Sequence, residues 1–168
     1  QGRMTLNPLA HLDPMGAILM LLTGIGWAKP VPINPGNFRN PKWGMAISSL
    51  AGPVSNLVLA YLSMVCWKIT SIISYYSSGL FIQNLLTIFS TMVAINVGLA
   101  VFNLIPVPPL DGSRILGLVL SQRNYFAIMR YERYIMLALM LAVFVGLLDG
   151  PLGFCRSIAF NALDFLTG

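Results

Sequence analysis

The sequence predicts an all-α fold, specifically a polytopic integral membrane domain built from helices. Of its 168 residues, 57% are hydrophobic and only 9% are charged, whereas about a quarter of the residues in a soluble domain are charged. Two apolar stretches, residues 44–67 and 79–105, are each long enough to cross a bilayer core, which takes about 20 helical residues. We therefore interpret residues 1–168 as one membrane-embedded domain with 44–67 and 79–105 as its spans.

The N-terminal part is interrupted by turn-forming residues. Residues 1–14 are polar, and residues 15–27 form an apolar segment too short for a full span unless the helix is short or tilted. Residues 28–43 contain four prolines and three basic residues. Because proline removes backbone donors and stops helices, we expect 28–43 to be an extended loop or hairpin.

The C-terminal part contains two weaker apolar segments. Residues 134–148 form the first, and residues 151–167 form the second, which is interrupted by Arg156 and Asp164. The second segment suits either a helix on the membrane surface or a poor span, and the sequence leaves both readings open.

Basic residues between the apolar segments predict an orientation. Residues 112–133 form a second basic loop, whereas loop 68–78 between the two spans has only Lys68. The basic residues of loops 28–43 and 112–133 are Lys29, Arg39, Lys42, Arg114, Arg123, Arg130 and Arg133. Two spans separate these loops, so both lie on one side, and the positive-inside rule makes that side cytoplasmic.

Composition also excludes some functions. The net charge of +5 does not indicate nucleic-acid binding, because the basic residues form no stripe interleaved with aromatics.

The two cysteines, Cys66 and Cys155, match no metal-ligand spacing. They are interpreted as small buried apolar residues.

The run from Asn103 to Gly112 is the strongest candidate site. Its three prolines, at 106, 108 and 109, stop the apolar helix and lead to one carboxylate, Asp111. An ionised aspartate beside an apolar span is costly, and such residues are usually kept because they pair, conduct or bind a metal. An Asp111 that caps a helix beginning near Ser113 is the structural alternative. Asn103 is a candidate either for a hydrogen bond to a neighbouring helix or for stabilising charge on a carbonyl oxygen.

Other polar residues give weaker signals. His11 is the only histidine and Glu132 the only glutamate. A lone histidine is more often structural than a ligand, and Glu132, between two arginines, is interpreted as a solvated ion-pair partner. The run Ala51-Gly52-Pro53 with Asn56 suits close helix packing and a kink, which leaves Asn56 as a secondary candidate.

Four stretches of the chain are informative when they are taken together and in order. The stretches are 2–16, which contains His11; Lys29-Pro30-Val31-Pro32 with Asn34-Pro35 and Asn37-Phe38-Arg39; Ala51-Gly52-Pro53 with Asn56; and Asn103-Leu104-Ile105-Pro106 with Pro109-Leu110-Asp111-Gly112. In this order they resemble the site-2 proteases, the zinc metalloproteases that cleave peptide bonds inside membranes. The resemblance covers most of residues 1–123 and is strongest to the compact prokaryotic branch.

The resemblance implies roles for two residues. Asp111 matches the aspartate that supplies the third protein ligand of one catalytic Zn2+, and Asn103 matches the active-site asparagine that assists substrate binding or the transition state. The other two ligands in the family are the histidines of an HExxH helix, whose glutamate is the general base. This sequence has no HExxH, and we expect the remaining ligands upstream of Gln1. A non-catalytic relative is the alternative.

The resulting hypothesis is the C-terminal portion of an intramembrane zinc metalloprotease in a prokaryotic cell membrane. Its expected partners are a transmembrane protein substrate and the lipid bilayer; the sequence specifies no oligomeric state. A small transporter or channel subunit is the rival from another class, because proline-broken apolar segments also suit transporters. A transporter would be expected to show related halves, and the sequence shows no internal symmetry.

Overall fold

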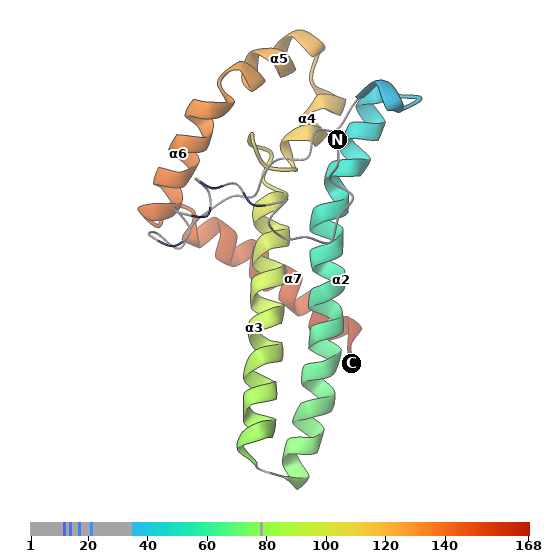
Figure 1. Cartoon of the computed structure of the whole chain (residues 1–168), viewed down its shortest axis with the longest axis vertical. Coiled ribbons are helices and arrows are strands. Elements are labelled where there is room, and N and C mark those ends of the chain that lie inside the picture. The colour runs from blue at the N-terminus through green and yellow to red at the C-terminus, as the bar shows by residue number, and fades with distance from the viewer. Residues whose placement is uncertain (1–11, 13, 15–16, 18–20, 22–34, 78) are drawn as a thin grey trace. The chain divides into compact units, whose positions relative to one another are not determined.

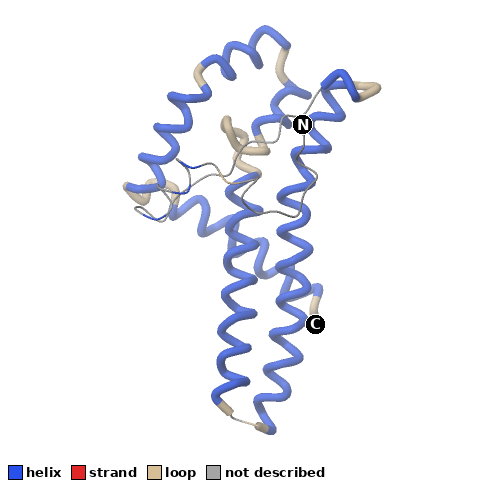
Figure 2. The backbone as a smooth tube through the Cα atoms, viewed as in Figure 1, coloured by secondary structure: helices blue, strands red, loops and turns tan. Residues whose placement is uncertain are grey.

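The computed structural model describes residues 35–77 and 79–168, together with Leu12, Pro14, Ala17 and Leu21. His11 and most of the predicted segment 15–27 lie outside the described residues. The helices of residues 35–168, of which the α-helices are labelled in Figure 1, belong to one compact unit, Pro35–Gly168. They are the short 3-10 helix η2 (Pro35–Asn37) and the α-helices α2 (Pro41–Tyr76), α3 (Leu80–Asn103), α4 (Ser113–Val119), α5 (Gln122–Arg130), α6 (Glu132–Phe144) and α7 (Asp149–Leu166). The described residues form no β-strand (Figure 2), which confirms the all-α prediction.

Helix α2 is longer than the predicted span 44–67. It begins with a cap, in which the Asn40 side chain accepts a hydrogen bond from the Trp43 backbone N–H at 3.5 Å, and with Pro41 in the first turn, a position that suits proline. The prediction that residues 28–43 are all loop is therefore wrong for 41–43, and residues 28–34 lie outside the described part. At 36 residues, α2 is about 54 Å long, well beyond a hydrocarbon core of about 30 Å.

The predicted loop 68–78 is also wrong, because α2 continues to Tyr76. This stretch contains no proline or glycine, and its hydroxyl groups bond within the helix. Thr70 Oγ1 donates to the Cys66 carbonyl at 2.7 Å, and Ser74 Oγ donates to the Ser71 carbonyl at 2.6 Å. Because these polar groups find partners one turn back along the helix, they do not require a turn in the chain.

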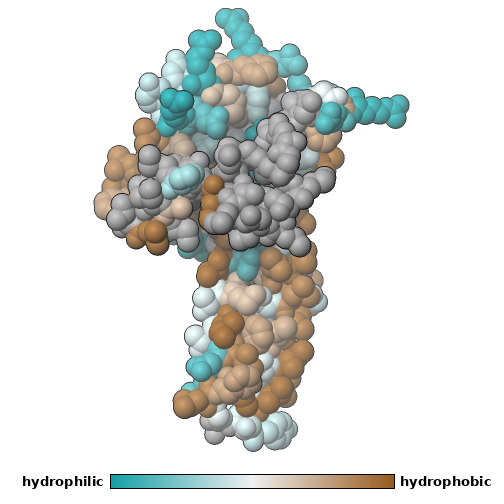
Figure 3. Space-filling view, viewed as in Figure 1, coloured by the Kyte–Doolittle hydropathy of each residue, from teal (hydrophilic) through white to brown (hydrophobic). Residues whose placement is uncertain are grey.

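Helices α2 and α3 form an antiparallel hairpin (Figure 1), and both are long and apolar enough to cross a membrane. Side chains from α2, α3 and α7 build the core, which consists of Ala60, Met64, Val93, Val97 and Leu163. Further small residues are buried along α2, namely Ala46, Ser49, Pro53 and Ser63. Larger side chains such as Ile72 and Leu80 are exposed, and hydrophobic residues cover much of the visible face of the long hairpin (Figure 3). Small residues inside and large apolar residues outside are typical of helices packed in lipid.

The predicted basic loop 112–133 contains two short helices, α4 and α5. Helix α4 packs against α2, and α5 packs against α4. Helix α5 begins with a cap in which Ser121 Oγ accepts a hydrogen bond from the Asn124 backbone N–H at 3.4 Å. The sequence reading missed α5 because a short helix rich in polar residues has no long apolar run.

The two predicted apolar segments near the C-terminus form α6 and α7, which meet at a bend of 83° and together resemble a broken span. Gly146 makes the bend possible, since its φ of 76° is rarely adopted by residues with a side chain. The Leu147 N–H donates to the Ala142 carbonyl at 2.9 Å, and the Gly146 N–H donates to the Val143 carbonyl at 3.0 Å, which is a Schellman motif. Leu163 is buried in the core, so α7 packs against the hairpin.

A salt bridge joins α7 to the C-terminal half of α2. Lys68 Nζ lies 2.8 Å from Asp164 Oδ1 and also donates to the Asp164 carbonyl at 3.1 Å. Lys68 is eight residues before the end of α2, which places it about 12 Å along the helix from that end. Charged residues in membrane-spanning helices are usually paired, and this pair lets both helices keep a charge beside apolar side chains.

We expect this salt bridge to couple the two residues energetically. Lys68→Met should lower the free energy of unfolding by about 1 kcal/mol, a modest figure because both side chains are partly exposed. Thermal unfolding of Lys68→Met, Asp164→Asn and the double variant in detergent gives the coupling energy. The free energy of unfolding should fall less in the double variant than the sum of its falls in the two single variants. Strict additivity would contradict a stabilising pair.

Candidate active site

The chain between α3 and α4 folds into a compact loop closed by the backbone. The Gly112 N–H donates to the Asn103 carbonyl at 2.7 Å, so the last residue of α3 meets the residue before α4. Inside the loop, the Leu110 N–H donates to the Val107 carbonyl at 2.9 Å. A Cβ atom on Gly112 would overlap the carbonyl oxygen of Leu104, and the close approach of the two ends therefore requires glycine.

This loop directs the Asp111 carboxylate toward α2. Asp111 Oδ2 lies 2.9 Å from the point that a Cβ atom on Gly52 would occupy. Gly52 is eleven residues beyond Pro41, the first residue of α2, or about 17 Å along the helix. The carboxylate therefore reaches the α2 face about 17 Å from the start of that helix, and it does so because Gly52 has no side chain.

The alternative in which Asp111 caps a helix is wrong. Helix α4 has Gly112 at its N-cap position, and no side chain makes a capping hydrogen bond. The Asp111 carbonyl accepts a hydrogen bond from the Arg114 N–H at 3.1 Å, as in an ordinary turn. Within the described residues the Asp111 carboxylate accepts no hydrogen bond, which leaves its oxygens available to another group.

Burial raises the pKa of the Asp111 carboxyl above its ordinary value, and the positive charge of Arg114 partly opposes this rise. Desolvation disfavours the ionised form of a carboxyl group, whereas a nearby cation favours it. The site therefore presents a partly desolvated carboxylate with one cationic side chain in its neighbourhood.

The structure brings some of the predicted residues together. Asn103 and Asp111 lie at the two ends of one hydrogen-bonded loop, and Asn103 is half-buried. The Asn103 side chain makes no hydrogen bond to the described residues, so the predicted contact with a neighbouring helix is not seen there. Asn56 is half-buried one helical turn after Gly52, on the same face of α2. Glu132 is exposed at the start of α6.

A complete zinc site needs more ligands than this part of the chain provides. Catalytic zinc usually has three protein ligands, and residues 35–77 and 79–168 contain no group of three His, Cys, Asp or Glu side chains placed to hold a metal. Asp111 alone fits as one oxygen ligand, because its carboxylate has no other partner in the described region.

Sequence reasoning missed the roles of Gly52 and Arg114. The run Ala51-Gly52-Pro53 predicted close helix packing, but it is the Asp111 side chain that lies against Gly52. The spacing of Asp111 and Arg114, one turn apart, was a signal for the charge interaction that lowers the Asp111 pKa.

Comparisons with known proteins identify the family of this chain. The model of Peptidase family M50 matches residues 63–147, which include Asn103 and Asp111. The "Putative zinc metalloprotease YwhC" of Bacillus subtilis (strain 168) is 44% identical over 116 residues, covering 69% of this chain and 53% of the relative. The chain thus spans about half the length of the curated relative that it matches. No solved structure matches it. From the family match over half of its length, this chain belongs to peptidase family M50, the site-2 protease family.

Proposed function

We propose that the chain forms part of an intramembrane zinc metalloprotease that hydrolyses peptide bonds in transmembrane segments of protein substrates. The observation that carries this proposal is the Asp111 carboxylate, held by a closed loop against Gly52 on the α2 face. A partly desolvated carboxylate that has no hydrogen-bond partner among the described residues suits a metal ligand. Asp111 is one ligand in this proposal, and the other ligands come from outside the described residues.

Asn103 has a separate role in the proposed reaction. The backbone hydrogen bond that closes the loop joins Asn103 to Gly112, the residue after Asp111, and the Asn103 side-chain amide has no hydrogen-bond partner among the described residues. It donates a hydrogen bond to the substrate carbonyl oxygen, where negative charge develops in the transition state. Zinc, when bound, polarises that carbonyl and lowers the pKa of its water.

The proposed membrane orientation follows from the charges. The basic residues Arg39, Lys42, Arg114, Arg123, Arg130 and Arg133 all lie in or near the start of α2 and in α4, α5 and α6. This basic end is cytoplasmic by the positive-inside rule. Asp111 lies at the same end of the hairpin, so cleavage occurs near the cytoplasmic face of a prokaryotic cell membrane.

The test uses the full-length protein reconstituted with labelled single-span membrane proteins. Cleavage should stop with a strong zinc chelator, continue with a non-chelating analogue and return when zinc is restored. Asn103→Ala should reduce kcat by about 100-fold, the typical cost of one lost oxyanion donor, with unchanged zinc content.

Asn96→Ala is the matched control, because the Asn96 side chain donates to the Met92 carbonyl at 2.8 Å within α3. It should leave cleavage near the wild-type rate. Cleavage that survives chelation would refute the metalloprotease proposal, and no cleavage of any substrate by the zinc-loaded protein would favour the non-catalytic relative.

A further inference from the structure

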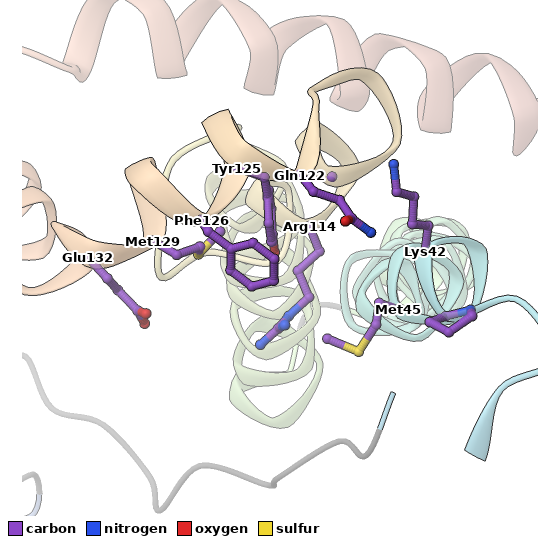
Figure 4. Close-up of a pocket in the computed structure, with 10 residues that line it drawn as sticks. Lys42, Met45, Arg114, Gln122, Tyr125, Phe126, Met129 and Glu132 are labelled. Carbon is purple, nitrogen blue, oxygen red and sulfur yellow. The ribbon is translucent and has the colours of Figure 1, made fainter. Parts of the chain in front are cut away.

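A cavity lies at the basic end of the unit, between the start of α2 and helices α4 and α5. Its volume is about 370 Å³, which is within the range of small-ligand sites. Figure 4 shows side chains of α5 facing Met45 of α2 across this space, with Arg114 of α4 between them. The cavity does not include Asn103 or Asp111, although it shares Arg114 with the surroundings of Asp111.

One part of the cavity is apolar. Met45 lies on the α2 side, and Phe126 and Met129 lie on the α5 side. Phe126 is 66% exposed, although it belongs to a helix that also carries Arg123 and Arg130. The Tyr125 ring packs close to α4 because Gly117 has no side chain; a Cβ there would lie 3.3 Å from the ring. This apolar wall is suited to hydrocarbon.

The other part of the cavity is cationic. Lys42 and Arg114 line it, and Glu132 is the one acidic residue among the described residues of the lining. Neither Lys42 nor Arg114 forms a salt bridge with the described residues. More basic side chains belong to the same end of the unit, namely Arg39, Arg123, Arg130 and Arg133. The surroundings of the cavity are therefore net positive and favour an anion.

We propose that this cavity binds an anionic phospholipid. The phosphodiester group lies between Lys42 and Arg114, and the first part of an acyl chain lies along Met45, Phe126 and Met129. An amphipathic helix with basic and aromatic side chains is typical of the membrane interface, and basic pockets between membrane helices bind anionic head groups. The combination of two cations with an apolar wall matches a lipid better than a soluble phosphate.

The test measures lipid retention by native mass spectrometry of the delipidated full-length protein in detergent. Phosphatidylglycerol should bind at least tenfold more tightly than phosphatidylcholine, and Lys42→Gln/Arg114→Gln should remove that preference. Lys42 is exposed in the first turn of α2, so Lys42→Gln alone provides a variant that folds if the double variant does not. The preference of the Lys42→Gln protein for phosphatidylglycerol over phosphatidylcholine should fall several-fold.

Arg156→Gln is the matched control, because Arg156 lies on α7 outside this cavity; it should keep the preference. Equal binding of the two lipids, or an unchanged preference in Lys42→Gln and the double variant, would overturn the proposal. Displacement of bound phosphatidylglycerol by inorganic phosphate would show a simple anion site. Its displacement by a substrate segment would show a substrate site, and each of these two results would also overturn it.

Discussion

Gly52→Ala should reduce proteolysis by up to about 100-fold without reducing the stability of the protein. The new Cβ atom would lie 2.9 Å from Asp111 Oδ2, closer than real Cβ contacts allow, so the carboxylate must move. A displacement of about 1 Å at a catalytic group can cost about 100-fold in rate. The helix itself gains, because alanine is favoured over glycine in a helix interior by roughly 0.5–1 kcal/mol.

Gly52→Ala is informative because it should lower the rate of proteolysis while it keeps or raises the stability of the protein. Cleavage rates and thermal unfolding of the full-length protein give the two quantities. Gly153→Ala is the matched control, since Gly153 lies in α7 with no atom within 4 Å of its Cβ position. Wild-type cleavage by Gly52→Ala would show that the position of Asp111 against α2 is unimportant.

Asp111→Asn should have the larger effect on chemistry. The substitution keeps the shape of the side chain and removes its charge, so the loop closed between Asn103 and Gly112 should survive. Substitution of a residue that hydrogen-bonds to a metal ligand typically lowers metal affinity or activity by about 10- to 100-fold. Loss of a direct ligand should lower them further. We therefore expect a fall in cleavage of more than about 100-fold.

The fold of the Asp111→Asn protein should be intact. Burial disfavours the ionised form of Asp111, as its raised pKa shows, so removing the charge removes a desolvation cost. The unfolding temperature should stay within a few degrees of the wild-type value. Asp149 is exposed at the start of α7, and Asp149→Asn should change neither the cleavage rate nor the unfolding temperature. A large loss of stability in Asp111→Asn would show that Asp111 is a structural residue.

Local sequence features predicted the main helices because apolar length is sufficient to identify a span. The residue runs 44–67 and 79–105 correspond to α2 and α3, although α2 extends farther at both ends. Lys68 marked a false boundary because its partner, Asp164, is 96 residues away in the chain. A charge that is paired only in the folded protein cannot be distinguished, in the sequence, from a charge in a loop.

The candidate site also combines features that the local sequence predicts with features that depend on contacts between distant residues. The prolines before Asp111 predicted the end of the apolar helix, and the structure has a hydrogen-bonded loop there. The direction of the side chain, toward Gly52 and away from the start of α4, depends on packing between distant segments. This packing also explains why a capping role was a reasonable alternative from local sequence and is incorrect in the folded chain.

The zinc content of the full-length protein tests the central claim most directly. Elemental analysis after purification without added metal should find about one zinc per wild-type chain and per Asp149→Asn chain, and much less in Asp111→Asn of equal thermal stability. That result would identify the Asp111 carboxylate as a ligand. An unchanged zinc content in folded Asp111→Asn would contradict the assignment.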